Sequence, residues 1–213
     1  RRACSTSSRC GDRVKAVTVG VLALQGDYEA HCAMLVRLEG VTPALVRTPE
    51  ELSDADGLII PGGESTTIGK LLVRVGLMEP IRSRASEGMP VYGTCAGMIL
   101  MARHIVGSDQ PRLGLMDITV ARNAFGRQID SFEADIPAPA FGDQPLRGVF
   151  IRAPYVTETG PGVEVLARFE EVIVAVRQEH LLATAFHPEL TSDTRVHEAF
   201  VESCRRLRTS SPS

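Results

Sequence analysis

The amino-acid sequence predicts an α/β fold, a single doubly wound, mostly parallel central sheet with helices on both faces and extra antiparallel strands in the second half. Two nearly continuous apolar and β-branched runs, 17–24 and 57–60, are typical of strands buried on both faces of a parallel sheet. They alternate with segments whose apolar residues recur at helical spacing. The 213 residues, 44% of them hydrophobic, are enough to enclose one full core.

The first half of the chain alternates strands with helices. Short runs rich in β-branched residues predict the strands, and apolar positions three and four residues apart predict the helices. The expected strands are 17–24, 44–46, 57–60 and 90–92, and the expected helices are 28–38 and 66–84. Ligands of such sheets bind at the carboxyl ends of the strands.

The second half contains mostly short strands. The expected strands are 118–121, 128–133, 149–151, 163–169, 172–177 and 181–185. An amphipathic helix over 193–207, capped by Asp193, ends this half. Residues 135–145 contain three prolines and a glycine, which predicts a surface loop.

These elements predict one domain over residues 16–208. Residues 1–15 are rich in Ser and Arg, so we expect them to be a disordered extension, and residues 209–213 to be a short tail.

Charge and cysteine content argue against several classes of protein. A formal net charge of −3 gives no electrostatic reason to bind nucleic acid or an anionic membrane. No apolar run approaches the ~18 to 20 residues of a membrane span. The five cysteines are odd in number and form no C-x-x-C pair, which indicates neither a disulfide framework nor a zinc site. We therefore expect a cytoplasmic protein that has no metal and no cofactor.

Cys95 lies in the sequence GTCAG, between a short apolar strand and an apolar helical segment. This pattern predicts a nucleophile elbow, a sharp turn whose flanking glycines avoid steric clashes. We expect the turn to present the thiol and not to bury it. A helix that begins at Ala96 favours the thiolate through its free N–H groups and its dipole. Cys95 is the candidate nucleophile.

His187 and Glu189 follow the last predicted strand in the sequence FHPE. Side chains two residues apart in extended backbone lie on the same side, so Glu189 can hold one imidazole nitrogen while the other faces Cys95. An isolated H-x-E pair is more often a loop histidine beside a solvated glutamate. For the other histidines we expect structural roles: His31, His104, His180 and His197.

The buried strand 57–60 ends in Pro61-Gly62-Gly63, which lets backbone N–H groups approach a ligand. The N–H groups of Gly63 and Ala96 are candidates for an oxyanion hole. The alternative is an ordinary strand-to-helix turn capped by Ser65 or Thr66.

Arg122 and Arg152 each follow a predicted strand. Arginine recognises carboxylates through paired N–H donors, so both are candidates for binding the α-carboxylate of an amino acid. The alternative for each is an ordinary surface arginine.

Together these motifs resemble the class I, triad-type glutamine amidotransferases, and within them the family of glutaminase subunits of pyridoxal 5′-phosphate synthase. The similarity runs from about residue 17 to residue 207. The motifs are LQG at 24–26, PGGESTT at 61–67, GTCAGM at 93–98, NAFGRQ at 123–128, DSFE at 130–133, FIRAP at 150–154 and FHPEL at 186–190.

The resemblance implies hydrolysis of L-glutamine to L-glutamate and ammonia. It implies that a tunnel passes the ammonia to a synthase partner within a large hetero-oligomeric complex that makes pyridoxal 5′-phosphate. Cys95 is then the nucleophile, His187 the general base and acid, and Glu189 the orienting carboxylate. The residues implied to contact glutamine are Gly63, Glu64, Ser65, Arg122, Ile151 and Arg152.

Three alternatives stay open. The chain can be a class I glutaminase of another pathway, such as that of imidazole glycerol phosphate synthase. It can be a non-catalytic regulatory subunit of the same fold. It can also be a cysteine peptidase built on the same type of sheet.

Overall fold

The structure, a computed structural model, describes residues 16–122 and 131–210. Its first half has the predicted alternation of strands and helices. The strands are β1 (Val17–Leu22), β2 (Val41–Val46), β3 (Gly57–Ile60) and β4 (Val91–Thr94). The helices are α1 (Tyr28–Leu35), α2 (Pro49–Ser53), α3 (Ser65–Arg74), α4 (Met78–Ser86) and α5 (Ala96–Met101).

The second half is rich in strands, as the sequence predicts. Its strands are β5 (Ala102–Ile105), β6 (Met116–Ala121), β7 (Ser131–Ile136), β8 (Leu146–Ile151), β9 (Tyr155–Thr159), β10 (Glu164–Phe169), β11 (Val172–Gln178) and β12 (Leu181–Thr184). Two short 3₁₀ helices, η1 (Pro139–Phe141) and η2 (Pro188–Leu190), and the long helix α6 (Arg195–Ser210) complete it.

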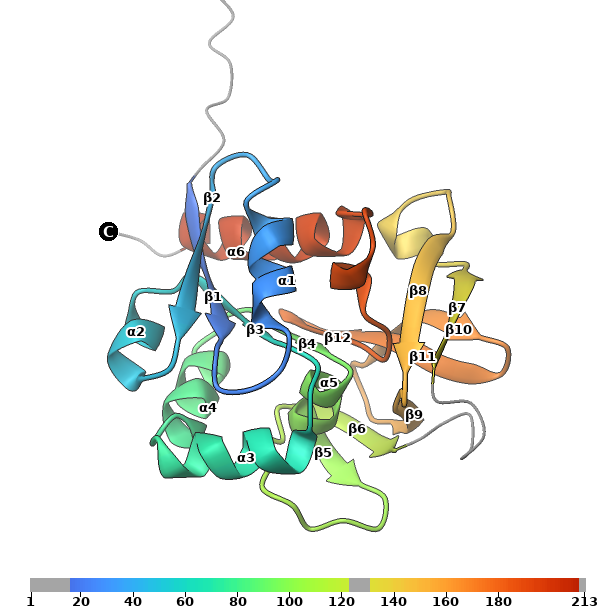
Figure 1. Cartoon of the computed structure of the whole chain (residues 1–213), viewed down its shortest axis with the longest axis horizontal. Coiled ribbons are helices and arrows are strands. Elements are labelled where there is room, and N and C mark those ends of the chain that lie inside the picture. The colour runs from blue at the N-terminus through green and yellow to red at the C-terminus, as the bar shows by residue number, and fades with distance from the viewer. Residues whose placement is uncertain (1–15, 123–130, 211–213) are drawn as a thin grey trace, which may run out of the picture.

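A ten-stranded sheet with the order β2-β1-β3-β4-β12-β11-β9-β6-β5 forms the centre, and β10 pairs with β11 beside this path. Strands β2, β1, β3, β4 and β12 are mutually parallel, whereas β12 pairs antiparallel with β11. Strands β7 and β8 form a separate antiparallel ribbon, at the right of Figure 1. The prediction of a mostly parallel sheet extended by antiparallel strands is confirmed.

Helices cover both faces of the parallel part of the sheet. Two glycines on opposite faces of the sheet show this, because each one packs closely against a helix. A Cβ on Gly57 would meet Cys204 and Phe200 of α6, whereas one on Gly93 would meet the backbone of α5. Ile60 pairs with Gly93 and is an odd number of positions from Gly57, so the two glycines face opposite sides. Helix α1 lies beside α6 on one face, and α3 packs with α5 on the other (Figure 1).

The structure corrects some predicted elements. Residues 66–84 form two helices, because Gly76 adopts a positive φ of 75° that ends the first of them. Helix α2 and the strands β5 and β9 were not predicted. The expected strand 44–46 extends back to Val41, and Asp193 accepts the N–H of Arg195 at the start of α6.

The loop predicted at 135–145 is shorter than expected, because β7 extends to Ile136 and η1 lies within it. Helix α6 continues to Ser210, into the predicted tail. The expected extension 1–15, the motif at 123–128 and the start of the predicted strand 128–133 lie outside the described residues.

Candidate active site

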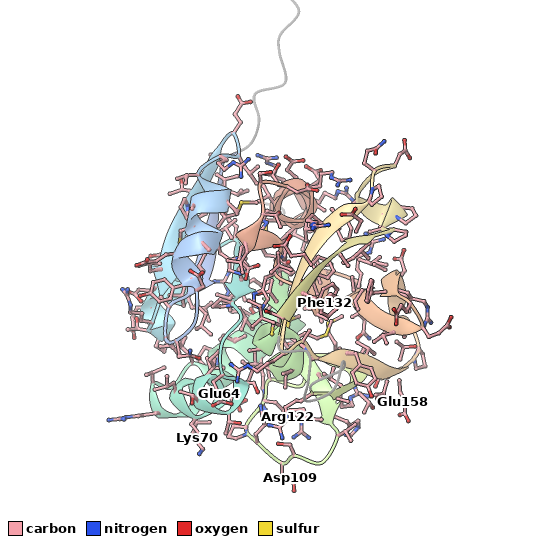
Figure 2. The ribbon with its side chains drawn as sticks, turned by 45° about the vertical axis from the view of Figure 1, so that its right-hand side comes forward. Glu64, Lys70, Asp109, Arg122, Phe132 and Glu158 are labelled. Atoms are coloured by element: carbon pink, nitrogen blue, oxygen red, sulfur yellow. The ribbon has the colours of Figure 1, made fainter. Side chains whose placement is uncertain are left out.

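A pocket of about 810 Å³ lies at the carboxyl ends of β3, β4, β6 and β8, the place expected for a ligand of this fold. The structure brings eight of the predicted site residues to its wall: Gly63, Glu64, Ser65, Cys95, Arg122, Ile151, Arg152 and His187. Glu189 and Ala96 are not among its lining residues. Glu64 and Arg122 lie at the same end of the molecule, although they follow different strands (Figure 2).

Cys95 occupies the predicted turn between β4 and α5. Its backbone has φ 47° and ψ −102°, a conformation that non-glycine residues rarely adopt. A Cβ on Gly97 would come within 2.3 Å of the carbonyl oxygen of Ile60, so only glycine fits there. The expectation of an unburied thiol is wrong, since Cys95 is 7% exposed, although it still lines the pocket. The tight packing of α5 against the sheet accounts for this burial.

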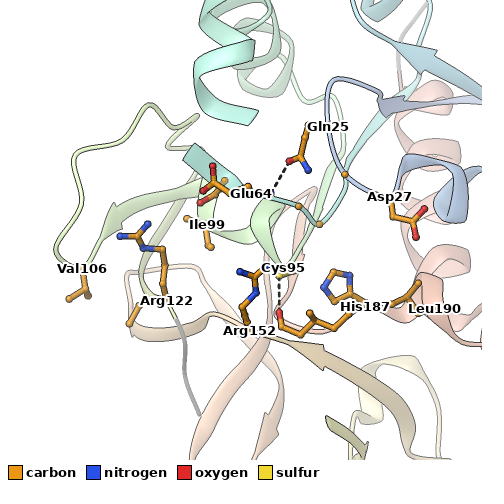
Figure 3. A pocket seen from close by; sticks show the side chains of 16 residues that line it. Gln25, Asp27, Glu64, Cys95, Ile99, Val106, Arg122, Arg152, His187 and Leu190 are labelled. Carbon is orange, nitrogen blue, oxygen red and sulfur yellow. Dashed lines mark hydrogen bonds between the residues drawn. The ribbon is translucent and has the colours of Figure 1, made fainter. Parts of the chain in front are cut away.

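His187 and Glu189 form the predicted pair. Nδ1 of His187 donates to Oε1 of Glu189 over 2.7 Å, and both residues are buried. The backbone that joins them differs from the expectation, because Pro188–Leu190 is a 3₁₀ turn and not extended chain. That turn directs the carboxylate behind the imidazole, whose ring faces Cys95 in Figure 3.

His187 and Glu189 each stabilise the charged form of the other. Burial opposes protonation of His187, but hydrogen bonds to Cys95 and Glu189 outweigh it and raise the pKa of His187 to about 10. Burial likewise opposes ionisation of Glu189, but attraction to His31 and hydrogen bonds from His187 and His31 hold the pKa of this carboxyl below its usual range. An imidazolium beside a carboxylate therefore lies next to the sulfur of Cys95 at neutral pH.

The predicted oxyanion segment packs directly against the histidine. A Cβ on Gly62 would lie 2.2 Å from Cε1 of His187, so glycine is needed for the strand end to approach the ring. Gln25 fixes the same segment from the other side, where its Oε1 accepts the N–H of Glu64 over 2.8 Å (Figure 3).

Glu64 caps helix α3, the role that the sequence offered to Ser65 or Thr66. Its carboxylate accepts the N–H groups of Thr66 and Thr67 over 3.0 and 2.7 Å. The hydroxyl of Thr67, with these N–H groups, lowers the pKa of Glu64 to about 2. Ser65 is buried, and its hydroxyl donates to Oε1 of Gln110.

Arg122 and Arg152 extend into the pocket from the ends of β6 and β8 (Figure 3). Arg152 has a positive φ of 43°, so its backbone is strained at the pocket. The neighbouring carbonyl of Ile151 accepts the thiol of Cys95 over 3.8 Å. Two guanidinium groups thus lie at the wall that carries the thiol, an arrangement suited to a ligand carboxylate.

Several residues near the site were not assigned a role from the sequence. Gln25 belongs to the LQG motif, which was the available signal for it. His31 contacts Glu189 from behind, and no local pattern indicates this contact. Further lining residues are Gly26, Asp27, Gly62, Ile99, Val106, Ala121 and Leu190.

Within residues 16–122 and 131–210, no group of three or more His, Cys, Asp or Glu side chains is arranged to hold a metal ion. None of the helices in these ranges is long and apolar enough to cross a membrane.

Comparison with known proteins places the chain in a family. Pyridoxal 5′-phosphate synthase subunit PdxT of Pelotomaculum thermopropionicum is 61% identical over 188 residues, which cover 88% of this chain and 95% of the relative. The subunit PdxT of Desulforudis audaxviator is also 61% identical, over 86% of this chain and 97% of its own. A crystal structure of a glutamine amidotransferase superposes with a TM-score of 0.83 at 51% identity, covering 87% of this chain and 98% of that one. A sequence model of the SNO glutamine amidotransferase family matches residues 21–206, and the chain belongs to this family.

Proposed function

We propose that the protein is the glutaminase subunit of a pyridoxal 5′-phosphate synthase. It hydrolyses L-glutamine to L-glutamate and supplies the ammonia to a synthase subunit, with which it assembles into a hetero-oligomer. Family membership and the names of the relatives support the pathway. The observation that carries the chemistry is the buried Glu189–His187 pair beside Cys95 at a pocket with two arginines.

Glutamine binds with its α-carboxylate toward Arg122 and Arg152. Its side chain then reaches the buried end of the pocket, where Cys95 lies. Arginine pairs with carboxylates through two parallel N–H donors, so these residues select an amino acid over a simple amide. Ser65, Glu64 and Ile151 supply the remaining contacts from the neighbouring strand ends.

Acylation begins when the Cys95 thiolate attacks the side-chain amide carbon of glutamine. A C–S bond forms, and the carbonyl oxygen takes up negative charge beside the N–H groups of Gly63 and Ala96. The His187 imidazolium then protonates the amide nitrogen, the C–N bond breaks and ammonia leaves. The raised pKa of His187 means that this proton is already present at neutral pH.

Deacylation reverses these roles. His187, now neutral, takes a proton from water, and the resulting hydroxide attacks the γ-glutamyl thioester carbon. The C–S bond breaks, glutamate leaves and the thiolate–imidazolium pair is restored. Glu189 keeps the imidazole in one orientation throughout, because Nδ1 stays bonded to its carboxylate.

Replacement of Cys95 tests the proposal. Cys95→Ala and Cys95→Ser are expected to lose at least about a thousandfold in glutamate release with the synthase subunit present, since neither forms the thioester at a useful rate. Cys32→Ser is the matched control, because this half-buried cysteine is not among the pocket residues. Glutamate release by Cys95→Ala equal to that of the unmodified protein would refute the proposed function.

A further inference from the structure

A chain of buried polar side chains continues behind the pocket, beyond the proposed triad. Oε1 of Glu189, which holds His187, lies 3.4 Å from Nε2 of His31. Nδ1 of His31 in turn lies 3.0 Å from Nε2 of His197. Both of these histidines are completely buried, and neither lines the pocket.

Three separate elements bring these buried polar side chains together. His31 lies on α1, His197 on α6 and Glu189 in η2, so the contact needs all three to pack on one face of the sheet (Figure 1). Burial of a polar group lowers the stability of the fold unless the group is hydrogen-bonded, and an apolar side chain in the same space would avoid this loss. His31 uses both ring nitrogens, since Nε2 also lies 3.2 Å from the hydroxyl of Thr94.

One ring proton of His31 can be placed from these contacts. Burial, together with the neighbouring His31, lowers the pKa of His197 to about 3, so His197 is neutral and carries one ring proton. A nitrogen that faces a carboxylate must itself be protonated, which places a proton on Nε2 of His31. Nδ1 of His31 and Nε2 of His197 lie at hydrogen-bond distance, so one of these two nitrogens donates to the other. Nδ1 of His197 has no partner among the described residues.

Among the described residues, Glu189 joins this network through Oε1 alone. Oε2 is buried and has no hydrogen-bond partner in the described part of the chain. Two contacts therefore set the rotation of the carboxylate, that with His187 and that with His31. Loss of the second would leave the carboxylate tied only to the imidazole that it has to orient.

We propose that His31 is a positioning residue for the triad. Its Nε2–H fixes the Glu189 carboxylate behind His187, and His197 holds the ring of His31 from the other side. This inference rests on the proposed function, because the role it assigns is in the reaction of Cys95.

Aromatic packing keeps the two additional rings in place. Tyr92 on β4 makes edge contacts with His31 and His197, with ring interplanar angles of 89° and 84°. Its hydroxyl lies 3.1 Å from the hydroxyl of Thr184. The groups that face His31 are thus one carboxylate, one neutral imidazole, one phenol and the hydroxyl of Thr94.

The substitutions His31→Gln and His31→Asn distinguish the contact of His31 with Glu189 from its contact with His197. A glutamine side chain can place its amide near the position of Nε2 and keep the contact with Glu189. An asparagine side chain can place its amide near Nδ1 and keep only the contact with His197. Both variants stay polar in the same buried site, so they test position and not burial alone.

The measurement is glutamate release with the synthase subunit present, over a range of glutamine concentration and pH. We expect His31→Gln to keep kcat within about threefold, and His31→Asn to lower kcat by about tenfold or more with KM little changed. In His31→Asn the alkaline limb of kcat should also move to lower pH, because a loosely held carboxylate no longer sustains the high pKa of His187.

Controls distinguish this inference from the proposed function. His180→Gln alters a half-buried histidine whose Nε2 bonds to the carbonyl oxygen of Ala85, and it should leave kcat and the pH profile unchanged. Equal activity of the Gln and Asn variants, or a loss with an unmoved alkaline limb, overturns the role of His31 alone. An active Cys95→Ala variant overturns the proposed function instead.

Discussion

At the scale of single residues, the protonation of His187 is the property that matters most for the proposed reaction. Burial alone would make this imidazole neutral, yet the thiol on one side and the carboxylate on the other raise its pKa to about 10. The ring is therefore a proton donor before glutamine binds. Glu189 contributes to this through its negative charge and through a hydrogen bond of 2.7 Å.

Glu189→Gln tests that contribution. The substitution keeps the shape of the side chain but removes its charge, so His187 loses part of the stabilisation of its protonated form. We expect kcat for glutamate release, with the synthase subunit present, to fall about a hundredfold or more. KM should change little because Glu189 does not line the pocket.

A matched control is Glu179→Gln, which removes a carboxylate whose side chain is 82% exposed. It should be fully active. If Glu189→Gln retained half of the original kcat, the negative charge of Glu189 would not be needed for the reaction.

At the scale of elements, the amino terminus of α3 both stabilises the helix and forms part of the pocket wall. Glu64 caps α3 through two backbone N–H groups, and the same residue lines the pocket. Thr48 caps α2 in a capping box with Glu51, and neither of these residues lines the pocket. Replacing each cap in turn therefore distinguishes an effect on stability from an effect on glutamine binding.

Glu64→Ala and Thr48→Ala are expected to lower the free energy of unfolding by similar amounts, about 1 kcal/mol each. Only Glu64→Ala should also raise KM for glutamine, because only this residue lines the pocket. Urea unfolding and steady-state glutaminase assays measure the two effects. Equal KM values in the two variants would show that Glu64 is a cap and nothing more.

Elements with a strong local signal were predictable from the sequence. Residues 57–60 are apolar throughout and form β3, whose residues Leu58, Ile59 and Ile60 have no exposed surface. The helix expected over 66–84 was wrong, because its apolar periodicity continues past the glycine that divides it. Strand β9 was missed because most of its residues are exposed and it lacks an apolar run.

Much of the site was predictable for a similar reason. Cys95 and His187 lie in short motifs whose spacing already implies a turn or a pair. The contact of His31 with Thr94 joins residues 63 positions apart, and that with His197 spans 166 positions. Such contacts depend on how whole helices pack, and no periodicity within a segment encodes them.

At the scale of the whole molecule, β12 is the strand where the parallel and antiparallel parts of the sheet meet. It pairs parallel with β4 and antiparallel with β11. Its carboxyl end thus lies beside that of β4, which places the segment that carries His187 next to Cys95. The helices α1 and α6 cover this junction on one face, where they bury His31 and His197.

The burial of His197 has a consequence for the stability of the whole fold. Its folded-state pKa of about 3 is depressed from an ordinary value of 6.5, so the unfolded chain takes up a proton first as the pH falls. The fold should lose stability between pH 6.5 and pH 3, at up to about 1.4 kcal/mol per pH unit from this group.

His197→Gln should remove that dependence. Between pH 6 and pH 5 we expect the free energy of unfolding to fall by about 1 kcal/mol more in the unmodified protein than in the variant. Urea titrations at both pH values measure this difference. The interval from pH 6 to pH 5 lies above the ordinary pKa of glutamate, so Glu189 contributes little to this change in the free energy of unfolding. Parallel pH dependence in both proteins would contradict a neutral, buried His197.

The central position of β12 also constrains the order in which the chain can fold. The hydroxyls of Tyr92 and Thr184 meet across β4 and β12 although they are 92 positions apart. During synthesis β4 is complete long before β12 emerges, and until then its free edge can pair with a strand of another chain. Insertion of β12 both closes that edge and delivers the segment that carries His187, so a chain that has not finished folding holds Cys95 without the imidazole proposed to act with it.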